Sequence, residues 1–105
     1  MKTITVQELK AKQDAKEDFQ LIDVREPYEI DICTINGDSI PMGEVMNRIE
    51  EISKDKPVYI HCRSGKRSAA VIDSLERGHG FDNLHNLTGG ILAYASEVDT
   101  SLEKY

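Results

Sequence analysis

Short apolar segments typical of buried β-strands alternate along this chain with segments whose apolar residues recur at helical spacing. Strand patterns occupy residues 3–6, 19–24, 58–61 and 81–87, and a further short strand is expected after the Asn36-Gly37 turn, through Ile40. Strands separated by helices form a mainly parallel sheet, because each helix carries the chain back across the sheet before the next strand begins. The sequence therefore predicts an α/β fold with a central, mainly parallel sheet flanked by helices on both faces.

The expected helices have recognisable ends. A capping box, Thr5-x-x-Glu8, predicts a helix through about Lys16. Pro27 is suited to the first turn of a short helix, with Glu26 favourable at its N-terminus. Three longer helices are then expected: an amphipathic one with Met42, Val45, Met46, Ile49 and Ile52 on its core face, one with Ala69, Ile72 and Leu75 ended by Gly78, and one opened by Gly89-Gly90 through about Val98.

Length and charge limit the function classes. The 105 residues suit one domain, residues 1–105, and the hydrophobic content of 39% is normal for a globular protein. No apolar segment reaches membrane length and the N-terminal residues do not resemble a secretory signal, so we expect a cytoplasmic protein. The net charge of −6 argues against nucleic acid and anionic membranes as partners.

The loop after the apolar segment Val58–His61 contains an unusual set of residues. Three of the thirteen basic residues of this acidic chain fall within it, together with a cysteine, a glycine and two serines: Cys62, Arg63, Ser64, Gly65, Lys66, Arg67 and Ser68. An isolated cysteine at a strand end is most often a buried structural residue. The coincidence of all these residue types at one strand-to-helix junction favours a reactive thiolate and an anion site instead.

Three features of this loop favour ionisation of Cys62. A helix follows it, whose N-terminus carries partial positive charge and free N–H groups. The flanking cations stabilise a negative sulfur, and Gly65 allows the backbone to turn several N–H groups inward. Ser64 and Ser68 add hydroxyl donors. The thiolate is the nucleophilic form of cysteine, so covalent catalysis through Cys62 is expected.

Several motifs resemble those of the single-domain rhodanese-type sulfurtransferases along nearly the whole chain. They are Leu21-Ile22-Asp23-Val24-Arg25-Glu26-Pro27-Tyr28-Glu29, Ile40-Pro41, His61-Cys62-Arg63-Ser64-Gly65-Lys66-Arg67-Ser68 and Asn86-Leu87-Thr88-Gly89-Gly90-Ile91. The tail from Glu97 to Tyr105 resembles the end of the rhodanese domain that is fused to adenylyltransferases of thiamine and molybdopterin synthesis. The segment 31–37 departs from the family's usual His-x-x-Gly-Ala pattern.

This resemblance implies transfer of a sulfane sulfur from thiosulfate or a persulfide donor to a thiophilic acceptor, through a persulfide on Cys62. The loop residues 63–68 would bind the small anionic donor. Arg67 is the best candidate for an arginine that ties the loop to the body of the protein. Asp23 is expected to be its ionic partner or to bind loop N–H groups, with Arg25 beside it. A sulfur-carrier protein, an adenylyltransferase or a cysteine desulfurase are possible partners.

Three other functions remain open at this stage. A phosphatase or arsenate reductase on the same fold would use Cys-x5-Arg, whereas Cys62 and Arg67 form the shorter Cys-x4-Arg. A smaller loop suits a sulfur atom carried on the cysteine. A non-catalytic interaction module is disfavoured because such relatives typically lose the cysteine. A sulfur relay that works only with a protein partner would show weak thiosulfate activity.

Other reactive side chains are expected to have structural roles. His61 is adjacent to Cys62 in a strand and should point to the opposite face, as a packed, hydrogen-bonded core histidine. Cys33 is either a resolving thiol or, more commonly for such a residue, a small buried hydrophobe. The histidines and cysteines are not at metal-ligand spacing, and no organic cofactor is implied.

Overall fold

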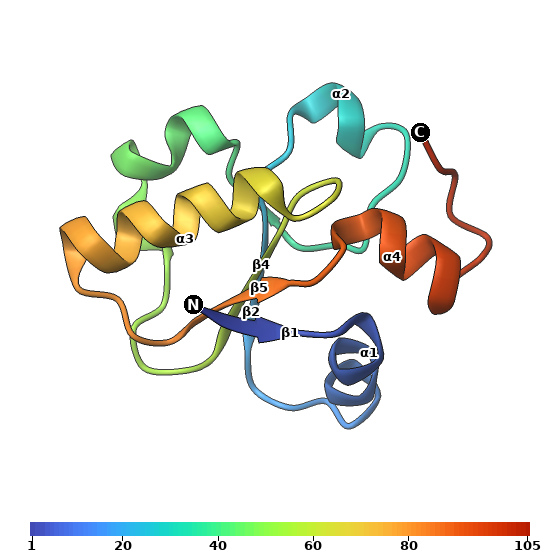
Figure 1. The fold of residues 1–105 in the computed structure, drawn as a ribbon, viewed down its shortest axis with the longest axis horizontal. Coiled ribbons are helices and arrows are strands. Elements are labelled where there is room, and N and C mark those ends of the chain that lie inside the picture. The colour runs from blue at the N-terminus through green and yellow to red at the C-terminus, as the bar shows by residue number, and fades with distance from the viewer.

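The computed structural model describes residues 1–105 and contains a five-stranded sheet (Figure 1). The strands are β1 (Lys2–Ile4), β2 (Gln20–Asp23), β3 (Asp38–Ser39), β4 (Val58–His61) and β5 (Leu84–Leu87). Their order in the sheet is β1-β5-β4-β2-β3, and every neighbouring pair is parallel. The predicted α/β fold is confirmed, and the carboxyl ends of β2 and β4 are adjacent because Asp23 pairs with His61.

Four α-helices and two short 3₁₀ segments surround the sheet. They are α1 (Val6–Asp14), α2 (Pro27–Ile30), η1 (Met42–Asn47), η2 (Ile49–Glu51), α3 (Lys66–His79) and α4 (Gly90–Glu97). Figure 1 shows α1 and α4 together on one side of the strands and α3 on the other. None of the helices has both the length and the apolar character needed to cross a membrane.

The side chains of β4 alternate between two apolar clusters, one on each face of the sheet. Val58, Ile60 and Cys62 lie in the cluster that includes the buried residues of α3 and η1. Tyr59 lies in the other cluster, with the buried residues of α1 and α4. Because β4 is buried on both faces, the residue that follows its carboxyl end is held by the centre of the fold.

The predicted helix starts are confirmed. The Thr5 hydroxyl accepts a hydrogen bond from the N–H of Glu8, and the Glu8 carboxylate accepts one from the N–H of Thr5, so the capping box is formed. The helix that follows ends at Asp14, slightly before the expected Lys16. The short helix α2 begins at Pro27, and α4 begins at Gly90, as expected.

Two expectations about helices were wrong. Gly80, with a φ of 68°, caps the C-terminus of α3, so the helix runs past Gly78. The segment predicted as one amphipathic helix forms η1 and η2, separated at Arg48, whose φ of −131° is not helical. At three residues per turn Val45 is buried, while the next side chain, Met46, is rotated by a third of a turn away from it.

Met46 is 44% exposed and Met42, at the first position of η1, is 40% exposed, so neither lies in the core as predicted. We expect Val45→Ala to lower the free energy of unfolding by roughly 2 kcal/mol, because it leaves a cavity under η1. Met46→Ala should change it by less than about 0.5 kcal/mol. Urea denaturation of both variants checks this, and equal losses would indicate a regular amphipathic helix here.

Candidate active site

Cys62 follows the carboxyl end of β4, and its sulfur is enclosed by the loop that leads into α3. The residue is 1% exposed. The N–H of Gly65 donates a hydrogen bond to Sγ at 3.1 Å, and Ser68 Oγ lies 3.4 Å from the same atom. Gly65 has a φ of 107°, a backbone conformation that residues with side chains rarely adopt. This conformation allows the loop to turn the N–H of Gly65 toward the sulfur.

Asn86 at the carboxyl end of β5 holds this loop from the neighbouring strand. Its Oδ1 accepts a hydrogen bond from Ser68 Oγ at 2.6 Å, and its Nδ2 donates to the carbonyl of Gly65 at 3.2 Å. Ser68 is fully buried between Asn86 and the sulfur of Cys62. The asparagine therefore fixes both the hydroxyl and the backbone turn that contact Sγ.

The hydrogen bonds around Sγ favour the thiolate. Burial by itself raises the pKa of Cys62, since it penalises the charged form. Hydrogen bonds from the N–H groups of Ser68, Gly65 and Ser64 oppose this effect, and the pKa is lowered below its ordinary value. The loop thus raises the fraction of Cys62 that is nucleophilic at neutral pH.

The N-terminus of α4 supports the loop from behind. The N–H of Ile91 donates to the carbonyl of Cys62 at 3.0 Å, and the N–H of Leu92 donates to that of Arg63 at 3.1 Å. Gly90 has a φ of 60° and packs directly on these carbonyls. A Cβ at position 90 would lie 2.4 Å from the Arg63 oxygen and 2.7 Å from the Cys62 oxygen, so only glycine fits there.

Arg67 ties the loop to the body of the protein through a partner that differs from the predicted one. Its Nη1 and Nη2 donate to the two carboxylate oxygens of Glu29 at 2.7 and 2.9 Å. The expectation that Asp23 pairs with Arg67 was wrong. Glu29 lies on α2, close enough for a two-pronged ion pair, whereas the carboxylate of Asp23 is occupied by Arg25.

The Asp23–Arg25 pair is almost completely buried. Asp23 accepts hydrogen bonds from Nε, Nη2 and the backbone N–H of Arg25 at 2.8 to 3.2 Å. The Arg25 guanidinium also donates to the carbonyls of Glu29 and Cys33, and so joins β2 to α2 and the segment after it. This ion pair braces the element that carries Glu29, and neither member contacts Sγ in a hydrogen bond.

His61 is fully buried, in agreement with the expected core role. Its Nδ1 lies 3.2 Å from the carbonyl oxygen of Cys62, and its Nε2 lies 3.6 Å from the Asp23 carboxylate. Burial lowers the pKa of His61, so the ring is neutral near pH 7. Its position beneath the loop makes it a packing residue and not a base for Cys62.

The remaining loop residues are the accessible ones. Ser64 and Lys66 are exposed and Arg63 is half-buried. The ion pairs of the structure include neither Arg63 nor Lys66. With Arg67 committed to Glu29, these two residues supply the positive charge that remains free to attract an anion.

Three residues of the site carried no assigned role in the sequence reasoning: Glu29, Asn86 and Tyr105. Glu29 accepts a hydrogen bond from the N–H of Glu26 at the start of α2, and this spacing of three was a readable signal of a capping carboxylate. The sequence indicated Asn86 only as the first residue of the motif Asn86-Leu87-Thr88-Gly89-Gly90-Ile91. Tyr105 Oη accepts from Arg25 and donates to Glu29, a contact across 76 residues that no local pattern indicates.

Cys33 is 7% exposed and packs in the cluster on the face of the sheet opposite to Cys62. Both cysteines are free thiols. This placement favours the packing role of Cys33 over that of a resolving thiol. No three side chains of the histidine, cysteine, aspartate and glutamate types lie together in a group that could hold a metal ion.

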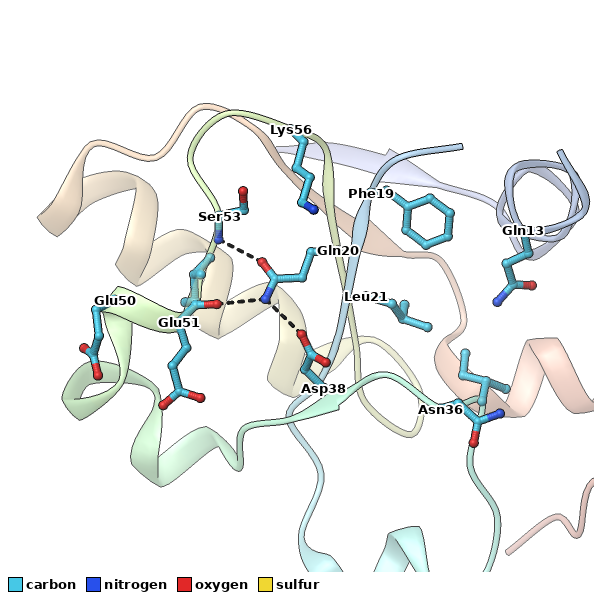
Figure 2. Close-up of a pocket in the computed structure, with 12 residues that line it drawn as sticks. Gln13, Phe19, Gln20, Leu21, Asn36, Asp38, Glu50, Glu51, Ser53 and Lys56 are labelled. Atoms are coloured by element: carbon cyan, nitrogen blue, oxygen red, sulfur yellow. Dashed lines mark hydrogen bonds between the residues drawn. The ribbon is translucent and has the colours of Figure 1, made fainter. Parts of the chain in front are cut away.

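A cavity of about 610 Å³ lies away from Cys62, around the start of β2 and the turn before β4 (Figure 2). Gln20 Nε2 donates to the Asp38 carboxylate and to the Glu51 carbonyl, and Gln20 Oε1 accepts from the N–H of Ser53. The acidic side chains outnumber the single lysine in its lining, which disfavours an anionic ligand. None of the residues that line this cavity belongs to the cysteine loop, so we place the candidate active site at Cys62 and not in the cavity.

The family model described as Rhodanese-like domain matches residues 5–97. The putative sulfurtransferase YtwF of Bacillus subtilis is 38% identical over 99 residues, which cover 93% of this chain and 94% of that protein. The probable adenylyltransferase/sulfurtransferase MoeZ of Mycobacterium tuberculosis is 33% identical over 106 residues, or 98% of this chain, but the match spans only 27% of MoeZ.

Among solved structures, the rhodanese-like domain protein from Staphylococcus aureus superposes with a TM-score of 0.82 at 33% identity. The match covers 100% of this chain and 99% of that one. Together with the relatives named as sulfurtransferases, this likeness supports sulfur transfer in general as the activity.

Gly90→Ala tests the contact between α4 and the cysteine loop. We expect the new methyl group to displace the carbonyls of Cys62 and Arg63, to lower the free energy of unfolding by more than about 2 kcal/mol, and to raise the pKa of Cys62. The pH dependence of alkylation by iodoacetamide and urea denaturation measure the two effects. Gly43→Ala is the control, since a Cβ there meets nothing within 4 Å. Equal behaviour of the two variants would contradict the prediction.

Glu29→Gln tests the ion pair with Arg67. Arg67 holds the pKa of Glu29 at about 2, below its usual 4.5, so the pair stabilises the fold above pH 4.5 and this stability is lost as the pH falls toward 2. We expect the variant to lose roughly 1–3 kcal/mol near pH 7, the lower end allowing for solvent screening at Arg67.

The difference between wild type and Glu29→Gln should shrink to less than half by about pH 3. Urea denaturation at the two pH values measures it. Glu44→Gln is a matched control, because its ion pair with Arg48 is exposed and contributes little. A loss at Glu29 that does not depend on pH would point to packing and not to charge.

Proposed function

The chain belongs to the rhodanese-like domain family, and we propose that it is a sulfurtransferase that carries a sulfane sulfur as a persulfide on Cys62, with residues 1–105 as the working unit. The observation that carries this proposal is the environment of Sγ: a buried sulfur that accepts a hydrogen bond from a backbone N–H and lies beside a serine hydroxyl. The backbone N–H groups that point at the sulfur favour its negative form, and a persulfide anion has the same requirement.

The proposed reaction has two half-reactions. The Cys62 thiolate attacks the outer sulfur of thiosulfate, an S–S bond forms to Cys62, and the S–S bond of the donor breaks so that sulfite leaves with the electron pair. A thiophilic acceptor, cyanide in an assay or a thiol in the cell, then attacks the outer sulfur of the persulfide. The Cys62 thiolate leaves with the electron pair and is regenerated.

The free cations of the loop support an anionic donor. Arg63 and Lys66 flank the cysteine and take part in no ion pair, on a chain whose net charge is −6. A localised positive charge on an otherwise acidic surface attracts a small anion to this loop. Gly65 and Ser68, with Ser64, supply the inward donors that would hold the transferred sulfur.

Phosphate-ester hydrolysis is a weaker proposal for this site. The spacing between Cys62 and Arg67 is one residue shorter than in the phosphatase loop. In addition, both terminal nitrogens of Arg67 are bound to Glu29, so this guanidinium is not presented to an anion beside the sulfur. A sulfur relay with a protein acceptor is the second candidate, since the match to MoeZ links a domain of this kind to an adenylyltransferase.

The intact mass of the reduced protein before and after exposure to thiosulfate tests the persulfide. We expect the wild type to gain one sulfur atom, which cyanide removes, and Cys62→Ser to gain none. Cys33→Ser is the matched control, because it removes the other cysteine on the opposite face of the sheet and should still gain the sulfur.

A gain in Cys62→Ser, or its loss in Cys33→Ser with the fold intact, would overturn the assignment to Cys62. If the wild type gains nothing while Cys62 remains alkylatable, thiosulfate is not the donor. Repeating the experiment with a cysteine desulfurase and cysteine as the sulfur source then tests the relay.

A further inference from the structure

The segment that follows α4 returns to the cysteine loop. The turn after the helix is fixed by hydrogen bonds from the N–H groups of Asp99 and Leu102 and from Ser101. The chain then runs toward α2, and Figure 1 shows its end beside that helix. Tyr105 consequently lies among Arg25, Glu29 and Arg63.

The hydroxyl of Tyr105 is fixed by two buried charged groups. It accepts a hydrogen bond from Arg25 Nη1 at 2.9 Å and donates one to Glu29 Oε1 at 2.9 Å. Both partners are themselves held, Arg25 by Asp23 and Glu29 by Arg67. An oxygen that both accepts and donates to fixed groups also fixes the direction of the attached ring.

The ring of Tyr105 faces the first cation of the cysteine loop. The guanidinium carbon of Arg63 lies 4.9 Å from the ring centroid, which is within the range of a cation–π contact. The backbone of Arg63 is held as well, because its carbonyl accepts from the N–H of Leu92 in α4. The aromatic ring therefore restricts a side chain that has no carboxylate partner and would otherwise sample many rotamers.

We propose that Tyr105 is a positioning residue that holds the Arg63 guanidinium at the cysteine loop, and that this pair gives the site its preference for anionic over neutral reactants. The inference rests on the proposed function only for the identity of the natural donor. The preference for negative charge is a property of the loop itself, and any reagent that reacts with the Cys62 thiolate reports it.

Two substitutions separate the contribution of the Tyr105 ring from that of its hydroxyl. Tyr105→Phe keeps the ring against Arg63 and removes the hydroxyl bonds to Arg25 and Glu29. Tyr105→Leu keeps apolar bulk but removes the π face. The first variant should lose stability and keep most of the preference for anions, whereas the second should lose both.

The readout is the ratio of the second-order rate constants for alkylation of Cys62 by iodoacetate, which is anionic, and iodoacetamide, which is neutral. Mass spectrometry of the Cys62 peptide excludes any contribution from Cys33. The thiolate is the form that attacks both reagents and displaces iodide, so a change in the pKa of Cys62 cancels in the ratio. We expect the ratio to fall about two- to fivefold in Tyr105→Leu and to change little in Tyr105→Phe.

The double variant Arg63→Ala/Tyr105→Leu tests whether Tyr105 acts through Arg63. Its ratio should equal that of Arg63→Ala, because the ring has no effect without the guanidinium. With thiosulfate, Tyr105→Leu should raise KM with little change in kcat, while Tyr105→Phe, which keeps the ring but loosens it, should raise KM less.

An unchanged alkylation ratio in folded Tyr105→Leu would overturn the inference. The inference would also be overturned if Tyr105→Leu lowered the alkylation ratio of Arg63→Ala as much as it lowers that of the wild type. Tyr105 would then act through a group other than Arg63. Absence of sulfur transfer in the wild type would count against the proposed function alone, because the alkylation ratio does not depend on that activity.

Discussion

The loop around Cys62 depends on backbone N–H groups that converge on it from two helices. Those at the start of α3 point at the sulfur, and those at the start of α4 bind the carbonyls of Cys62 and Arg63. The second interaction needs a closer approach than any side chain permits, which is why Gly90 stands at the contact. The sulfur is thus placed by main-chain groups that β4 and β5 hold from the centre of the sheet.

Some charged side chains near the loop are held in ion pairs that brace the structure, whereas others are free to attract an anion. Asp23 with Arg25 and Glu29 with Arg67 form two ion pairs with buried carboxylates, linked by the hydroxyl of Tyr105. Breaking such a pair leaves an uncompensated buried charge, so these residues brace the site. Arg63 and Lys66 lie outside the pairs. The ion pairs therefore hold the loop in place, while Arg63 and Lys66 supply unpaired positive charge on a protein of net charge −6.

Local patterns predicted most elements because their signals are short-range. The capping box at Thr5, the proline start of α2 and the Gly89-Gly90 start of α4 appear where expected. The expected helix from Met42 failed because apolar spacing alone does not distinguish an α-helix from two short 3₁₀ segments. Its two methionines, expected in the core, are exposed.

The sequence by itself determined the parallel α/β architecture and the position of Cys62 at a strand end, since strand and helix periodicities and loop composition are local properties. It also marked Arg67 as the residue that ties the loop down. Only the tertiary structure decided that its partner is Glu29 and that Tyr105 joins the network. Ion pairs and aromatic contacts between distant residues depend on how the elements pack, and several carboxylates near one loop are equivalent until that packing is known.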